Sequence, residues 1–446
     1  MVDYTVHSRK DRKKILKYLG IDSKEDIFDF LPGKIRDPVI NIPEGLDERS
    51  LRKKLEAIGS QNNPVSGLSS FLGGGAYDHY VPAVVEYITS ISQFFTAYTP
   101  YQAEISQGTL EYIFEFQSLI CQLTGMDISN ASTYDGASSL AEAVLMASRI
   151  NGRKKVVMPV TINPQYRDTV KSYVYGLDMD IREVGYKDGV TDLSSLEKEI
   201  DENTSAVLIQ NPNYFGCYEE VFKIKKIMEA YPDCLYIICV NPLSLALIKP
   251  PSEYGADIVV GDGQVFGNTL SMGGPYLGFF SARQKYLRQL PGRIVGKTID
   301  AGGKDAYVLT FQTREQHIRK KKATSNICSN HSLNALACTA YLLYKGEKGL
   351  KSTATACIKK AAYFADRLKE TTHFKKAFKN NSFNELVVTS DLDMDDVLGR
   401  LKKEKILGGI RLGQYYPELA DSMLVSFTEV NTWGEIDRYI DILKGI

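Results

Sequence analysis

The stretch GADIVVGDGQVFGNTLSMGGPYLGFF, residues 255–280, sets the framework of this protein. An apolar, β-rich run comes first, a turn studded with glycines follows, and a second apolar run closes the stretch. This order predicts two buried strands joined by a short connection. The stretch contains no lysine, and Gln264 follows the first strand directly.

Short apolar segments alternate with helical or turn-rich stretches through the middle of the chain. Five of these segments are predicted to be strands: 155–160, 179–186, 205–213, 234–242 and 256–262. Strands that alternate with helices are typical of parallel crossovers. The pattern therefore predicts an α/β fold with a mainly parallel, doubly wound sheet.

The two ends of the chain have different patterns. Residues 1 to about 60 read as short helices without a strand, with starts at Ser8 and Ser23. An apolar-rich helix is expected from about 81 to 98, and another from about 109 to a stop at Gly125. From about residue 326, two long helices precede alternating strands and helices. We therefore predict a helical arm that wraps a neighbour (1–70), a large domain (71–325) and a small α+β domain (326–446).

Composition excludes several classes of partner. Of the 446 residues, 43% are apolar and 24% are charged, and Lys+Arg equals Asp+Glu at 54 each. Such a balance gives no long-range field to attract nucleic acid or an anionic membrane. The amino terminus lacks the apolar core of a secretory signal, and no apolar run approaches the roughly 20 residues of a membrane helix. We therefore expect a cytoplasmic protein.

Metal and disulfide chemistry is also not indicated. The seven cysteines, at 121, 217, 234, 239, 328, 338 and 357, form no CxxC pair, so we expect buried, reduced thiols. No two of the five histidines have the helical spacing of metal ligands. The segment GDGQVFG misses the GxGxxG spacing, and GxxxxGK[ST], HExxH and GxSxG are all absent. No metal is therefore expected.

Four longer stretches carry a family resemblance. They are YTPYQAEISQGTLEYIFEFQSLICQLTGMDISNAS (98–132), GADIVVGDGQVFG (255–267), PGRIVGKTID (291–300) and YVLTFQTREQHIRKKKATSNIC (307–328). They resemble the P-protein of the glycine cleavage system, a glycine decarboxylase that depends on pyridoxal phosphate (PLP). The resemblance implies the fold-type I, aspartate aminotransferase-like PLP-transferase fold. By length and motifs the chain is similar to the first half of that protein, called subunit 1.

Two positions depart from what a PLP enzyme needs. The PLP-bearing half of the family ends the matching strand with a His-Lys-Thr-Phe motif, and Gln264 stands here where that lysine would be. An amide nitrogen cannot form a Schiff base, because its lone pair is delocalised. Asn241 stands where such enzymes usually place an aspartate beside the pyridine nitrogen. We interpret both residues as satisfying buried backbone groups, so no covalent catalytic residue is expected in this chain.

The resemblance then implies a division of labour. PLP would be bound covalently by subunit 2, the partner in an α2β2 assembly. The two chains together would decarboxylate glycine on PLP and transfer the aminomethyl group to the lipoyl arm of H-protein. Water has to be kept from this chemistry, so walls and a narrow channel are needed. This chain would supply them.

Two loops are the first candidates for that lining. One is expected to project from a proline-fixed turn and contains Tyr98, Thr99, Tyr101, Gln102 and Glu104. In the alternative interpretation, its tyrosines fill the junction between the flanking helices. The other, FLGGGAYDHYVP, is predicted to be a flexible hinge that bears Tyr77 and His79, with a plain surface loop as the alternative.

A basic run is the candidate for binding anions or a partner. It contains Arg314, His317, Arg319 and Lys320, which could contact acidic faces of H-protein or a phosphate across the subunit interface. An exposed, charged helix face would explain the same run. The segment DGASSLAE (135–142) stands at the place of a phosphate-cradling helix start, where it either still binds an anion or only packs.

Two other functions stay open at this stage. A self-sufficient PLP lyase or aminotransferase would need an unrecognised lysine, such as Lys249 or Lys297, both in segments that read as loops. A purely structural scaffold would only stabilise its partner.

Overall fold

The computed structural model describes residues 7–36 and 41–446, and it divides into two compact units, Met1–Pro64 and Val65–Ile446. The parts of the predicted arm at 1–6 and 37–40 lie outside the described residues. The first unit ends six residues before the predicted arm does, and 65–446 form one unit. The predicted division at residue 326 stays a prediction.

The first unit consists of short helices. Its α-helices are α1 (Arg9–Leu19), α2 (Gly33–Arg36) and α3 (Glu48–Gly59). Ser8 begins α1 with a capping box, as its sequence predicts. Ser23 instead binds the Asp26 carboxylate at 2.9 Å, ahead of a 3-10 turn, η1 (Glu25–Phe28), so that predicted start lacks an α-helix.

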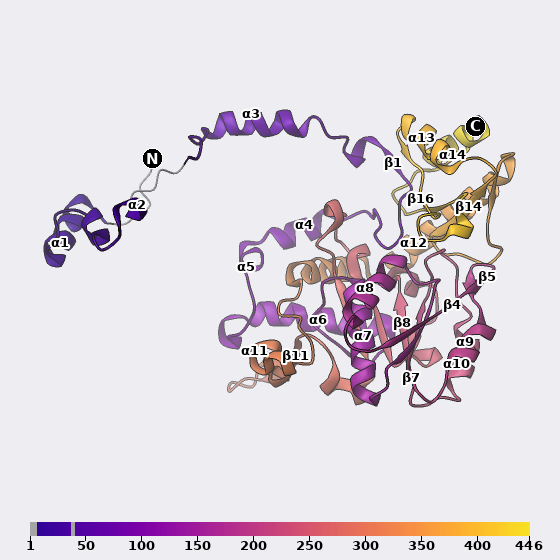
Figure 1. Ribbon diagram of the computed structural model, residues 1–446, viewed down its shortest axis with the longest axis horizontal. Helices are drawn as coiled ribbons and strands as arrows, with labels where there is room; N and C mark the ends of the chain where they lie inside the picture. Colours follow the sequence, from indigo (N-terminus) through magenta and orange to yellow (C-terminus); the bar gives the residue numbers. More distant parts are fainter. Residues whose placement is uncertain (1–6, 37–40) are drawn as a thin grey trace. The chain divides into compact units, whose positions relative to one another are not determined.

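A seven-stranded sheet is the centre of the second unit (Figure 1). Its order is β2 (Ile128–Ser129), β10 (Gly278–Ala282), β9 (Ile258–Asp262), β8 (Leu235–Val240), β7 (Thr204–Gln210), β3 (Lys155–Pro159) and β4 (Asp180–Val184). The five strands from β9 to β4 are parallel, and β10 runs antiparallel to both of its neighbours, β9 and β2. The five predicted strands and the second apolar run of 255–280 all lie in this sheet.

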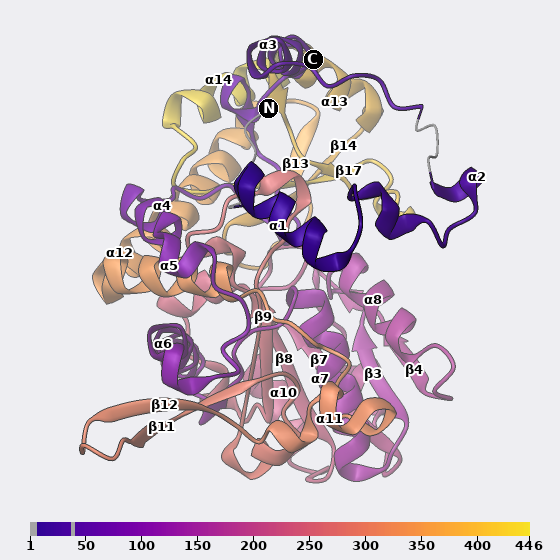
Figure 2. The ribbon, with the colours of Figure 1, turned by 90° about the vertical axis from the view of Figure 1, so that its left-hand side faces the viewer.

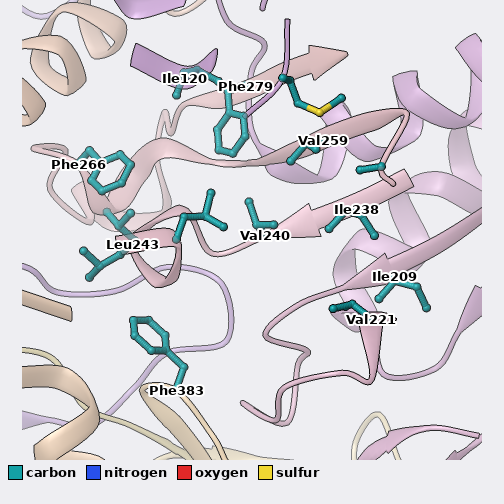
Figure 3. Close-up of a cluster of buried hydrophobic side chains, with 14 of the residues drawn as sticks. Ile120, Ile209, Val221, Ile238, Val240, Leu243, Val259, Phe266, Phe279 and Phe383 are labelled. Atoms are coloured by element: carbon teal, nitrogen blue, oxygen red, sulfur yellow. The ribbon is translucent and has the colours of Figure 1, made fainter. Parts of the chain in front are cut away.

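Helices cover both faces of the sheet because neighbouring strand residues point to opposite sides. On one face, Ile238 and Val259 pack with α6 (Gln107–Thr124), α10 (Val221–Met228) and α12 (Ser332–Arg367) (Figure 3). On the other face, Ile237 and Ile258 pack with α7 (Gly136–Asn151) and α8 (Pro164–Val174). This three-layer arrangement places the carboxyl ends of the parallel strands at one edge.

The helix predicted over 81–98 is interrupted. The structure has α4 (Ala83–Ser90) and α5 (Ser92–Phe95), separated by Ile91 in an extended conformation (ψ 121°). No glycine or proline marks this break, so local propensity could not reveal it. The next helix, α6, follows the prediction and ends at Gly125, whose φ of 69° suits glycine.

The carboxyl-terminal part forms a second, smaller sheet on the same unit. Its order is β13 (Phe374–Lys376), β14 (Glu385–Ser390), β17 (Ser422–Ser426) and β16 (Ile410–Arg411), with helices α13 (Met394–Lys403) and α14 (Trp433–Lys444). Figure 1 shows this layer in orange to yellow above the central sheet. The long helix α12 leads into it. A kink at Gly346 divides α12 into two helical stretches, where the sequence predicts two long helices.

An antiparallel hairpin, β11 (Ile294–Ile299) and β12 (Asp305–Thr310), extends away from the central sheet (Figure 2). Lys297 lies on β11, which corrects its predicted place in a loop, and its ammonium pairs with Asp305 at 2.7 Å. No helix among the described residues is long and apolar enough to cross a bilayer. All seven cysteines are free; five are buried, whereas Cys121 is half-buried and Cys328 is exposed, against the prediction.

Candidate functional site

A small cavity lies at the carboxyl edge of the sheet, where ligands of doubly wound folds bind. It is lined by Gly75, Tyr77, Asn163, Tyr166, Gln210, Cys239, Val240, Asn241, Pro242, Asp262 and Val265. We call it the closed cavity. Its volume of about 20 Å³ accommodates a single water molecule. None of these described lining residues is a lysine.

Gln264 lies between two lining residues of the closed cavity, Asp262 and Val265, in a 3-10 turn, η6 (Gly263–Val265), directly after β9. Its Oε1 accepts the Tyr77 N–H at 2.9 Å, and its Nε2 donates to the carbonyls of Tyr77 and Asn268 at 2.8 Å each. The side chain is 1% exposed. Its amide is therefore fully engaged with backbone groups.

Asn241 follows β8 and begins another 3-10 turn, η4 (Pro242–Ala246). Its Oδ1 accepts the Leu243 N–H at 3.1 Å, while its buried Nδ2 has no partner in the described chain. A neutral amide here provides no carboxylate for a pyridine nitrogen.

The start of α7 is already bound to carboxylates of the chain itself. Asp262 accepts the N–H of Gly136 at 3.0 Å through one oxygen, and the N–H groups of Gln264 (2.9 Å) and Leu277 (3.3 Å) through the other. Asp135 accepts the Ser138 N–H at 2.7 Å. Burial raises the pKa of Asp262 to about 6, although these backbone donors act to lower it. Asp262 thus accepts an N–H group at the start of α7, the kind of position where backbone amides bind anions.

A glycine turn brings the segment before α4 against the cavity. At Gly75, with φ of 116°, an added Cβ would lie 2.8 Å from the Asn163 amide, so only glycine permits this approach. Tyr77 then donates its hydroxyl to Glu385 of β14 at 2.7 Å, and Glu385 also accepts the Gly74 N–H at 2.6 Å. Burial raises the pKa of Glu385 to about 7.

These contacts test whether the chain could hold PLP itself. The predicted lysine position holds a hydrogen-bonded glutamine, Asp262 accepts an N–H at the predicted phosphate-binding helix start, and the remaining space is the size of one water. The residues present do not fit PLP. The segment 135–142 is expected from the sequence either to bind an anion or only to pack. Its N–H groups bind the carboxylates of Asp262 and Asp135, which belong to the chain itself.

Tyr77 and His79 are buried, each 6% exposed, so they do not lie on a plain surface loop; the predicted flexibility of this hinge stays a prediction. His79 Nδ1 lies 2.6 Å from the Glu429 carboxylate, whose second oxygen accepts the Tyr80 N–H at 2.9 Å. The Cys357 sulfur lies 3.8 Å from the same carboxylate. These three side chains bring potential metal ligands within 4.8 Å; His79 Nδ1 pairs with Glu429, while the buried His79 Nε2 has no partner in the described chain. The expected lack of a metal stays a prediction.

The loop of residues 98–105, here called the aromatic loop, contrasts with the closed cavity. Tyr98 is 78% and Tyr101 51% exposed. The exposed side chains of Gln102 and Glu104 have no hydrogen-bond partner within the described chain, and Thr99 is half-buried. These residues project, as their sequence predicts, and the tyrosines do not plug a helix junction.

Arg293 joins the aromatic loop to the basic segment, residues 314–322. Its guanidinium donates to the Tyr101 hydroxyl at 3.2 Å and lies 5.4 Å from the centre of that ring. It also lies 3.6 Å from Glu315, and the His317 ring packs edge-on against Tyr101 at 5.8 Å. Tyr101 and His317, predicted from separate stretches, therefore belong to one surface.

The cations of the basic segment differ in availability. Arg314 donates to the carbonyls of Leu290 and Gly292, and burial lowers its pKa to about 10. It therefore faces inward, which corrects its prediction as an interface residue. Arg319 donates to the Thr313 carbonyl at 3.0 Å but is exposed, as is Lys320.

Several buried groups escaped sequence analysis. Asp262, Glu385 and Arg293 are each more than nine-tenths buried although they are charged. The sequence does contain a signal of their burial, because each is a single charged residue next to an apolar strand segment. Their partners, however, lie far away in sequence, so their roles could not be deduced.

No described lysine replaces the missing one. Lys249 is exposed and pairs with Glu253 at 2.7 Å, and Lys297 is paired on the hairpin. Lys360 is the one buried lysine of the described chain, and its ammonium donates to the carbonyls of Thr428 and Glu429, outside the closed cavity.

Comparison with known proteins gives consistent results. The family model described as "Glycine cleavage system P-protein" matches residues 3–443. The chain is 47% identical over 444 residues to the "Probable glycine dehydrogenase (decarboxylating) subunit 1" of Carboxydothermus hydrogenoformans, covering 99% of each chain. It is 46% identical over 432 residues to the protein of the same name from Desulforamulus reducens, covering 97% of each.

Solved structures show the same fold. A crystal structure of glycine decarboxylase (P-protein) of the glycine cleavage system, in inhibitor-bound form, superposes with a TM-score of 0.90 at 36% identity, covering both chains completely. Glutamate decarboxylase of Lactobacillus brevis superposes with a TM-score of 0.68 at 14% identity, over 93% of this chain and 96% of that one. The chain therefore has the fold-type I architecture predicted from its sequence.

Proposed function

The chain belongs to the glycine cleavage system P-protein family, and we propose that it is the subunit without a cofactor lysine in a two-chain glycine dehydrogenase (decarboxylating). The two relatives above are both named subunit 1, and this chain aligns with nearly the whole length of each. A second subunit would bind PLP covalently, and the two chains would assemble as α2β2.

One observation carries this proposal: the position of the cofactor lysine is Gln264, and its amide is fully engaged with the backbone of Tyr77 and Asn268. A PLP-dependent reaction in this family then requires a lysine from another chain. Asp262 at the start of α7 and the one-water closed cavity support the same conclusion.

The aromatic loop is the part of this chain that we assign to the shared active site. When bound by the partner, PLP supplies an electron sink for glycine decarboxylation. Tyr98 and Tyr101 would form an apolar wall that excludes water, and Gln102 offers an amide to orient a bound carboxylate or the lipoyl arm. Arg293 fixes the position of Tyr101.

The exposed cations of the basic segment fit a docking role. Arg319 and Lys320 would attract acidic surfaces of the lipoyl H-protein, whereas Arg314 supports the backbone. Glycine is the proposed substrate, and the acceptor of the aminomethyl group is the lipoyl arm. Seven unpaired cysteines are in keeping with the reducing cytoplasm, where we propose that the enzyme works.

The two other functions are less well supported. A self-sufficient PLP enzyme would need a lysine in the closed cavity, and Lys249, Lys297 and Lys360 all lie elsewhere. A pure scaffold would have no use for the unpartnered Gln102 and Glu104 at its surface. Activity measurements on variants separate this scaffold from the proposed role.

Co-expression tests the proposal. The chain is produced alone, the lysine-bearing subunit alone, and both together, and glycine-dependent exchange of carbon dioxide is measured with H-protein present. We expect activity only from the two chains together, in a complex with equal numbers of each. Full activity from the lysine-bearing subunit alone, or from this chain alone, would contradict the proposal.

A further inference from the structure

A second, larger cavity lies away from the closed cavity, between α7, the end of α8 and residues 321–327. Its volume is about 660 Å³, within the range of roughly 300 to 1,000 Å³ typical of small-molecule sites. We call it the α7 cavity. The function proposed above makes no use of it.

A buried carboxylate with an unsatisfied oxygen lines the α7 cavity. Glu142 is 3% exposed; its Oε1 accepts the Ser325 hydroxyl at 2.8 Å, and its Oε2 has no partner in the described chain. Burying such an oxygen without a hydrogen-bond donor is energetically unfavourable. A donor from a ligand would remove this cost, and a cationic donor would suit a carboxylate best.

Positive charge lies farther along the same wall. Arg149 follows Glu142 by two helical turns, so both side chains point to one side of α7. Both line the α7 cavity, yet no ion pair joins them in the described structure. Lys321 adds a second cation from the opposite wall. The cavity thus presents a carboxylate and two cations, with no ion pair between them among the described residues; the Arg149 guanidinium also donates to the Gln289 carbonyl at 3.3 Å.

The remaining walls are mostly aromatic or apolar. Tyr134 and Tyr173 line the α7 cavity, as do Leu177 and Met179. Such walls bind an apolar or aromatic side chain, and a few polar groups then fix its orientation. A ligand that matches the Glu142 carboxylate, the two cations and the apolar walls carries an ammonium, a carboxylate and an apolar group.

We propose that the α7 cavity binds a free α-amino acid with an apolar or aromatic side chain. Its ammonium donates to Glu142 Oε2, its carboxylate faces Arg149 and Lys321, and its side chain packs between the tyrosines. Polyphosphates fit poorly because Glu142 repels them, and polyamines because Arg149 repels a second ammonium. Glycine lacks the side chain that the apolar walls would hold.

A panel of ligands tests this site on the unaltered full chain by titration calorimetry. L-Phenylalanine is expected to bind with one site per chain. N-acetyl-L-phenylalanine, which lacks the ammonium, phenethylamine, which lacks the carboxylate, and glycine are each expected to bind about tenfold more weakly or worse. Absence of saturable binding of L-phenylalanine, or equal binding of the N-acetyl derivative, would overturn the proposal.

Variants then assign the groups. Glu142→Gln keeps the size of the side chain and is expected to weaken L-phenylalanine binding by about tenfold or more, while the exposed control Glu253→Gln leaves it unchanged. Arg149→Gln changes a partly exposed side chain and should abolish the preference for L-phenylalanine over phenethylamine. Unaltered binding in Glu142→Gln, or an unaltered preference in Arg149→Gln, would contradict the assignment.

Discussion

The closed cavity and the aromatic loop are built in opposite ways. At the closed cavity, both Asp262 oxygens have partners from the chain itself, as does the neighbouring Gln264 amide, and space remains for one water. On the aromatic loop, Tyr98 is largely exposed, and the Gln102 side chain has no hydrogen-bond partner in the described chain. Apart from the unpaired Asn241 Nδ2, the polar groups named in the first region are satisfied within the chain, whereas the second region leaves Gln102 and Glu104 exposed.

The interior has the fold-type I architecture, and groups of the chain itself bind the Gln264 amide and the Asp262 carboxylate. The aromatic loop exposes Gln102 and Glu104 without partners in the described chain. Changes in the interior should therefore affect stability, and changes in the aromatic loop should affect activity.

The largest effect is expected from Asp262→Ala. The substitution leaves the N–H groups of Gly136, Gln264 and Leu277 without their acceptor, so the free energy of unfolding should fall by about 3 kcal/mol or more. Urea denaturation measures the change. Asp305→Ala, which removes a surface pair, is the control, with an expected loss within about 1 kcal/mol. Equal losses in the two variants would refute the role of Asp262.

A somewhat smaller effect concerns the pH dependence of stability. Burial raises the pKa of Glu385 from 4.5 to about 7, so the folded protein binds this proton more tightly than the unfolded chain. The resulting stability is fully present below pH 4.5 and is lost as the pH rises to about 7.

Glu385→Gln removes this titration and should reduce the fall in unfolding free energy across that pH range by about 2 to 3 kcal/mol. Denaturation curves at a series of pH values measure it. Asp262, with a raised pKa of about 6, contributes a fall of the same sign in both proteins. Parallel curves for wild type and variant would contradict the raised pKa.

The aromatic loop should respond in activity alone. Tyr101→Phe loses the hydroxyl that binds Arg293, and Gln102→Ala loses an unpartnered amide; each should lower glycine-dependent carbon dioxide exchange of the two-chain enzyme about tenfold. The unfolding free energy should change by less than about 1 kcal/mol. Size-exclusion chromatography checks assembly. Unchanged carbon dioxide exchange in both variants would contradict the lining role and favour the alternative that the chain is only a structural scaffold.

The smallest effects are expected from the surface lysines. Lys249→Ala and Lys297→Ala each break one exposed ion pair, which is worth about 0 to 1 kcal/mol. Neither should alter the activity of the two-chain enzyme. A variant that loses activity without losing assembly would reopen the possibility of an unrecognised catalytic lysine.

Buried parallel strands were well predicted, because they read as continuous apolar runs such as those that became β7 and β8. The break at Ile91 and the hairpin with Lys297 carried no comparable signal. Gln264 and Asn241 could be located from the sequence through the motif that surrounds them.

The partners of these residues could not be located. Gln264 binds Tyr77 from 187 positions away, and Tyr77 binds Glu385 across 308 positions. Pairings over such separations depend on the folded topology. Sequence analysis therefore located the glutamine at the predicted lysine position but not the Asp262 carboxylate that binds the start of α7.

Borohydride reduction followed by intact-mass spectrometry tests most directly whether this chain holds its own cofactor. The chain is incubated with PLP, first alone and then in complex with the lysine-bearing subunit, and is reduced before the masses are measured. We expect no phosphopyridoxyl mass on this chain in either sample and a stoichiometric one on its partner. A stoichiometric adduct on this chain would contradict the assignment of the PLP linkage to the second subunit.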